Sequence, residues 1–151
     1  MMFNWTPDMI RFMRDASEYG DYNKKIAELV VRNLPKSASV CDAGCGLGYL
    51  SLALSEHVKN VTAVDIKQEA LAVLRENIAA RGIKNIEVKC ADINNLPEES
   101  SFDAMVFCFF GGLEEILDIA KKHCHGTVFM AKKNYDTHRF SVGKHKQESD
   151  S

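Results

Sequence analysis

The residues with the clearest chemical meaning lie in the segment Asp42-Ala-Gly44-Cys45-Gly46-Leu-Gly48. Glycines at alternate positions let the backbone of a turn approach a bound molecule closely. The carboxylate of Asp42, directly before the turn, would repel a pyrophosphate and attract a positively charged group. The segment therefore predicts a site for a ligand that carries positive charge and no phosphate.

Two phosphate-binding motifs that use similar turns do not fit this segment. The P-loop requires G-x-x-x-x-G-K-[ST], and no Lys-Ser or Lys-Thr pair follows Gly48. The dinucleotide fingerprint requires glycine or alanine where this chain has Tyr49. S-adenosylmethionine fits better, because it carries an ammonium group and a sulfonium but no phosphate.

Two further carboxylates are placed to contact the rest of such a ligand. Asp65 ends the next apolar segment, 21 residues after Gly44, where a carboxylate that binds ribose hydroxyls is expected. Asp92 follows the third apolar segment and could accept a hydrogen bond from an adenine amino group. Simpler roles remain open: Asp42 and Asp92 could cap the elements that follow them, and Asp65 could be a solvated strand end.

The elements that would position these residues alternate between strand and helix patterns. A nearly continuous apolar run at 102–109 is typical of a central parallel strand that is buried on both faces. The alternation predicts an α/β fold with a doubly wound, mostly parallel sheet, whose ligand site lies beyond the carboxyl ends of the strands. Strands are expected at 39–42, 60–65, 85–90, 102–109 and 126–131, and helices at 6–20, 21–33, 47–57, 68–81 and 113–124.

Taken in order, these motifs resemble those of the class I S-adenosylmethionine-dependent methyltransferases. The family's first motif, acid-x-G-x-G-x-G, matches residues 42–48, and its acids after the second and third strands match Asp65 and Asp92. The Phe-Asp pair of its fourth motif matches Phe102-Asp103. The resemblance covers about residues 15–131. It implies a Rossmann-like fold, methyl transfer, and S-adenosylmethionine as cofactor with S-adenosylhomocysteine as product.

The resemblance also implies roles for the polar candidate residues. The turn from Gly44 to Gly48, with Cys45 inside it, would lie along the methionine part of the cofactor. Asp42 would support this turn and, through water, the ammonium group. Asp65 would hold both ribose hydroxyls, and Asp92 would contact the adenine.

The remaining candidates are apolar or aromatic, and each has an alternative role in packing. Ile66 and Ile93 would sandwich the adenine, and the pair Phe107-Cys108 would border the methyl acceptor. Tyr19 or Tyr22 is similar in position to a tyrosine that covers the cofactor in many members.

The acceptor side of the site departs from part of the family. Enzymes that methylate bases or glutamine carry Asn/Asp-Pro-Pro-Tyr/Phe after the fourth strand, where this chain reads FCFFGG at 107–112. This difference argues against methylation of adenine or glutamine. His123, His125, His138 and His145 are general-base candidates by residue type alone, so no catalytic residue is assigned.

Composition limits the function classes further. The chain has 151 residues and a formal net charge of −2, which argues against nucleic acid and anionic membranes as partners. It has no apolar run of membrane-spanning length and no apolar signal segment at its start. Five cysteines, an odd number, argue against a disulfide framework. We expect a cytoplasmic protein with a small-molecule acceptor and no metal. An RNA or protein methyltransferase and a non-catalytic cofactor-binding module are the alternatives.

The chain divides into three expected parts. Helices in 1–35 would cover the cofactor site, residues 36–133 would form the α/β core, and 134–151 would be a polar tail, either disordered or the start of a missing segment. The family usually adds a strand hairpin after the fifth strand, and the tail shows no strand-like alternation. We therefore expect the hairpin to be missing. The exposed edge of the fifth strand would then be covered by the tail or pair with a second copy of the chain.

Overall fold

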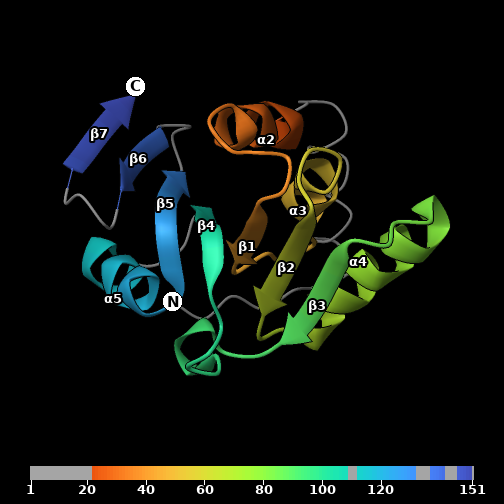
Figure 1. The fold of residues 1–151 in the computed structure, drawn as a ribbon. Coiled ribbons are helices and arrows are strands. Elements are labelled where there is room, and N and C mark those ends of the chain that lie inside the picture. Colours follow the sequence, from red (N-terminus) through yellow and green to blue (C-terminus); the bar gives the residue numbers. More distant parts are fainter. Residues whose placement is uncertain (1–21, 109–111, 132–136, 142–145, 151) are drawn as a thin grey trace.

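The computed structural model describes residues 22–108, 112–131, 137–141 and 146–150 (Figure 1). The helix expected at 6–20 lies outside these residues. The described elements are α2 (Tyr22–Val31), β1 (Ser39–Ala43), α3 (Tyr49–Leu54), β2 (Asn60–Asp65), α4 (Gln68–Arg81), β3 (Ile86–Cys90), the short 3₁₀ helix η1 (Ile93–Asn95), β4 (Phe102–Cys108), α5 (Leu113–His123), β5 (Cys124–Ala131), β6 (Thr137–Ser141) and β7 (Lys146–Asp150).

The strands form one sheet in the order β3-β2-β1-β4-β5-β6-β7, and β1 to β5 run parallel. β1 lies between β2 and β4, and its last residue, Ala43, pairs with Val64 on one side and Phe107 on the other. The strand order therefore reverses at β1, which is the point where ligands bind in such sheets. The expected doubly wound α/β fold is confirmed.

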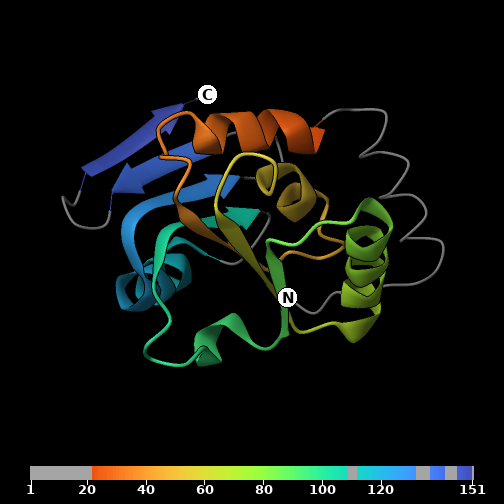
Figure 2. The same ribbon diagram turned by 45° about the vertical axis from the view of Figure 1, so that its right-hand side comes forward.

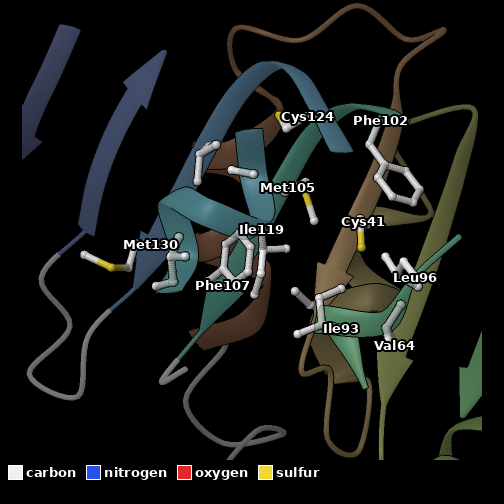
Figure 3. Packing of buried hydrophobic residues seen from close by; sticks show 14 residues of the cluster. Cys41, Val64, Ile93, Leu96, Phe102, Met105, Phe107, Ile119, Cys124 and Met130 are labelled. Atoms are coloured by element: carbon white, nitrogen blue, oxygen red, sulfur yellow. The ribbon is translucent and has the colours of Figure 1, made fainter. Parts of the chain in front are cut away.

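Helices cover both faces of the sheet (Figure 2). α2, α3 and α4 pack on the face to which Val40 and Val106 contribute, and α5 packs on the opposite face, to which Met105 and Phe107 contribute. Figure 3 shows the core between the sheet and α5, where Met105 and Phe107 lie near Ile119 of α5. Successive residues of β4 thus face two different cores, which explains the continuous apolar run in the sequence.

The C-terminal hairpin is present, so the expectation that the chain lacks it is wrong. β6 pairs antiparallel with β5, from Thr127↔Ser141 to Ala131↔Thr137, and β7 pairs antiparallel with β6. The edge of β5 is therefore occupied by β6 and is not free for the dimer considered from the sequence. The strand sequences THRFS and KQESD have almost no apolar alternation. β7 is the last strand of the sheet, where polar residues are common, whereas β6 pairs on both sides.

The amino ends of β1 and β4 are joined through Asp103. Its Oδ2 accepts a 2.8 Å hydrogen bond from the Ser39 backbone N–H, and its Oδ1 lies 2.7 Å from Nε2 of His125. The other nitrogen of His125 lies 2.8 Å from the Ser101 hydroxyl. This cluster sits at the opposite end of the strands from the glycine turn. His125 is therefore not placed to act as a base there.

His123 also has a structural position away from the turn. It ends α5, is buried, and its Nδ1 lies 2.9 Å from the Ser100 carbonyl oxygen. None of the helices in the described part of the chain is both long and apolar enough to span a membrane.

We expect Asp103→Asn to lower the free energy of unfolding at pH 7 by about 1 kcal/mol, a value kept small because the carboxylate is partly exposed. The Ser39 N–H and then His125 hold the pKa of Asp103 below its usual range. A carboxyl whose pKa is lower in the folded than in the unfolded protein stabilises the fold at pH values above its unfolded-state pKa. This contribution is lost as pH falls through the folded-state pKa.

The difference between the two proteins should therefore shrink in acid, as measured by urea unfolding at pH 7 and pH 3. Glu87→Gln is the control, because the Glu87 carboxylate forms an exposed 3.6 Å pair with Lys89. A difference that stayed constant with pH would contradict this role of Asp103.

Candidate functional site

The glycine turn follows β1 directly, at the carboxyl end of the sheet and at the reversal of strand order. Gly44, Gly46 and Gly48 all have positive φ, at 68°, 57° and 80°. Residues with a Cβ rarely adopt this left-handed conformation. The turn therefore requires glycine at all of these positions, as its sequence suggested.

Three backbone N–H groups of the turn donate to acceptors within the protein. Cys45 donates to the Val64 carbonyl at 2.9 Å, and Gly48 donates to the Cys45 carbonyl at 3.0 Å. Gly46 donates to Oδ2 of Asp65 at 2.8 Å. These bonds join the turn to the end of β2. Burial raises the pKa of the Cys45 thiol, so this residue adds no charge to the turn at neutral pH.

Gly48 has a second role, which the sequence did not reveal. A Cβ at this position would overlap the side chain of Leu74 in α4, well inside van der Waals contact with Cδ1. Leu74 is fully buried. The missing side chain of Gly48 therefore lets α4 pack directly against the turn.

Asp42 is buried beneath the turn, with 1% of its surface exposed, and contacts α3. Its Oδ2 accepts a 2.6 Å hydrogen bond from the hydroxyl of Ser51, which is 0% exposed. Burial raises the pKa of Asp42 to about 7, the Ser51 hydrogen bond opposes this rise, and the charge of Asp65 adds to it. Asp42 thus supports the start of α3, while its contact with a cofactor ammonium group stays a prediction.

Asp65 lies at the end of β2 and is only partly buried. Oδ2 accepts from Gly46 and Oδ1 accepts a 2.9 Å hydrogen bond from the Lys67 backbone N–H. A carboxylate has about four acceptor positions, so the two that remain could accept from two hydroxyl groups. The structure thus places Asp65 next to the turn in a fixed orientation, while ribose binding by this residue stays a prediction.

Asp92 follows β3, is exposed, and caps η1. Its Oδ1 accepts hydrogen bonds from the backbone N–H and the side-chain amide of Asn94, at 2.9 and 3.1 Å. The Asn94 amide also lies 3.3 Å from Oε1 of Glu115 in α5. The capping alternative is therefore present in the structure, and adenine binding by Asp92 stays a prediction. Asn94 and Glu115 were not identified from the sequence.

The two isoleucines differ in their surroundings. Ile66 is 51% exposed beside Asp65, so its side chain offers an apolar surface to a base. Ile93 is 4% exposed and belongs to the core cluster that also contains Phe107 and Val64 (Figure 3). Only Ile66 presents a large face outward in this structure.

The remaining candidates that the structure describes lie inside the core or at the ends of elements. Phe107 is fully buried in the same cluster, so it would support the acceptor side from within. Cys108 and Tyr22 are placed as the last residue of β4 and the first residue of α2, and Tyr19 lies outside the described residues. Their binding roles stay predictions.

Comparison with known proteins gives one matching family model, described as Methyltransferase domain, over residues 40–133. The malonyl-[acyl-carrier protein] O-methyltransferase of Bacillus cereus is 28% identical over 131 residues, covering 77% of this chain and 48% of that protein. The ribosomal protein L11 methyltransferase of Phocaeicola vulgatus is 38% identical over 82 residues, covering 54% of this chain and 29% of that protein. The chain thus spans half or less of the length of these relatives.

The fold is similar to solved structures as well. The crystal structure of a candidate S-adenosyl-L-methionine-dependent methyltransferase from Methanococcus maripaludis matches with a TM-score of 0.71 at 20% identity. The match covers 87% of this chain and 67% of that one. At this identity the likeness shows a shared fold.

We expect Gly48→Ala to lower the free energy of unfolding by about 2–4 kcal/mol, from backbone strain of about 1 kcal/mol together with overpacking against Leu74. Gly82→Ala is the matched control, because Gly82 has a φ of 64° and a Cβ added there would meet no atom within 4 Å. It should lose only the strain component. Urea unfolding of both variants tests this, and equal losses would show that Leu74 does not constrain the turn.

Proposed function

Because the chain belongs to the methyltransferase domain family, the class I S-adenosylmethionine-dependent methyltransferases, we propose that it binds S-adenosylmethionine at the glycine turn and transfers its methyl group to a small-molecule acceptor. The observation that carries this proposal is the way the turn is built. It is flanked by two carboxylates, and the N–H groups of Cys45, Gly46 and Gly48 donate within the protein.

This construction disfavours a phosphate-bearing ligand. Turns that bind phosphate direct free backbone N–H groups at the anion. Here Cys45, Gly46 and Gly48 donate to Val64, Asp65 and Cys45, respectively. The carboxylates of Asp42 and Asp65 would also repel a pyrophosphate. The same charges favour a ligand with an ammonium group and a sulfonium.

Each candidate residue would contact a different part of the ligand. Asp65 has acceptor positions left for the ribose hydroxyls, and Ile66 presents an apolar face next to it for the adenine. Asp92 lies at the end of the neighbouring strand, where it could accept from the adenine amino group. The turn would lie along the methionine part, with Asp42 below it.

When bound, S-adenosylmethionine supplies a methyl group that is already activated by its sulfonium. The chain then has to hold the acceptor in line with the methyl group and exclude water. Phe107 and its apolar cluster provide a rigid base under the end of β4. A general base is needed only if the acceptor must lose a proton. Both His123 and His125 are hydrogen-bonded at the amino ends of the strands, to Ser100 and Asp103 respectively, away from the turn.

The acceptor could also be a macromolecule. One relative in the comparison is named for a ribosomal protein and another for a malonyl group on a carrier protein, so protein-linked acceptors are the second candidate. The net charge of −2 counts against RNA. A cofactor-binding module without catalysis is the third, and absence of methyl transfer despite cofactor binding would distinguish it.

The test of the proposed function has two stages. Calorimetry should give binding of S-adenosylmethionine and S-adenosylhomocysteine, and no binding of NAD or ATP. Incubation with methyl-labelled donor and separate pools of metabolites, proteins and RNA then identifies the acceptor class from the labelled fraction. Tighter binding of NAD than of S-adenosylhomocysteine would refute the proposal.

We expect Asp65→Ala to weaken S-adenosylhomocysteine binding by about 2–4 kcal/mol, because two charge-assisted hydrogen bonds to the ribose are lost. The control is Asp118→Ala, which removes the same charge from an exposed position of α5 and should leave affinity unchanged. The measurement is the dissociation constant by calorimetry. If both variants bound like the unmodified protein, Asp65 would hold the turn without contacting the ligand.

A further inference from the structure

Ser51 is a buried polar residue to which neither the family match nor the sequence motifs assign a role. It lies in α3, three residues after Gly48, and is 0% exposed. Its hydroxyl donates a 2.6 Å hydrogen bond to Oδ2 of Asp42, which is itself 1% exposed. A hydroxyl and a carboxylate thus meet in a nearly water-free space directly beneath the turn.

A carboxylate in such a space is strongly biased toward its neutral form. Burial without compensation disfavours the charged state, and burial is the largest cause of the raised pKa of Asp42. The negative charge of Asp65, at the end of β2, acts in the same direction. Cys41 and Cys45, on either side in the chain, have raised pKa values and remain neutral thiols near pH 7.

Ser51 provides the opposing interaction. Its hydroxyl is the largest contribution that lowers the pKa of Asp42, and its backbone N–H adds a smaller one. A short hydrogen bond from a hydroxyl to a carboxylate stabilises the charged form. The same bond fixes the side-chain orientation of Asp42, because both residues sit on packed elements, β1 and α3.

We propose that Ser51 is a positioning residue, which keeps the Asp42 carboxylate charged and oriented under the glycine turn and so extends cofactor binding down to neutral pH. This inference rests on the proposed function, because a ligand with an ammonium group is what makes the charge of Asp42 matter. Ser51 itself does not touch the ligand.

The direction of the pH effect follows from linkage. A ligand whose ammonium group lies near Asp42 stabilises the ionised carboxylate, so binding releases the proton of Asp42 wherever that group is protonated. Affinity therefore rises as pH increases through the pKa of about 7 and levels off above it. Loss of the Ser51 hydroxyl raises this pKa and moves the whole profile to higher pH.

The experiment compares Ser51→Ala with Ser55→Ala and the unmodified protein between pH 6 and 8.5. Ser55 is the matched control, because it caps the end of the same helix and its hydroxyl donates at 2.7 Å to the Leu52 carbonyl rather than to Asp42. A rise of about one unit in the pKa of Asp42 predicts that Ser51→Ala weakens S-adenosylhomocysteine binding about fivefold at pH 7 and less than about twofold at pH 8.5. Ser55→Ala should follow the unmodified profile.

A second measurement separates this inference from the proposed function. Carbon-13 NMR of the Asp42 carboxyl without ligand, assigned with Asp42→Asn, should show a titration midpoint that rises in Ser51→Ala and not in Ser55→Ala. If no S-adenosylhomocysteine bound to the unmodified protein, the proposed function would fall, and with it the role of Ser51 in binding. An equal loss of affinity at every pH, or an unchanged NMR midpoint, would overturn the inference alone.

Discussion

The site depends on the hydrogen bonds that join the glycine turn to the end of β2. Val64 accepts from Cys45, and the side chain of Asp65 accepts from Gly46. These bonds are possible only because β1 and β2 pair in parallel. Their register places Ala43, the last residue of β1, opposite Val64. The core of the sheet thereby determines where the carboxylate of Asp65 stands relative to the turn. A shift of one residue in this register would separate them.

Much of this arrangement could be predicted from local patterns. The alternation of apolar runs with helical spacing placed β1 to β5 and α4, because buried parallel strands and amphipathic helices leave distinct periodicities. α3 was expected at 47–57 but spans Tyr49–Leu54, since the positive φ of Gly48 delays its first turn. β6 and β7 were missed, because their sequences lack the apolar alternation from which strands are predicted.

The side-chain partners in the site were harder to foresee than its elements. Ser51 meets Asp42, and Leu74 fills the space beside Gly48, through contacts between residues 9 and 26 positions apart in the chain. Such pairs depend on the position and orientation in which each helix packs on the sheet, which cannot be predicted from a single sequence. Ile93 illustrates the same limit, because its place in the core cluster with Ile116 and Ile119 of α5 could not be predicted, and its contact with the adenine stays a prediction.

The two ends of the strands serve different purposes. The cluster around Asp103 and His125 closes the amino ends, and the glycine turn with Asp42 and Asp65 occupies the carboxyl ends. Stabilising changes can therefore accumulate at one end without disturbing ligand geometry at the other, since distant sites contribute almost independently to stability. Destabilising changes that alter binding at the carboxyl ends can then be offset by stabilising changes at the amino ends.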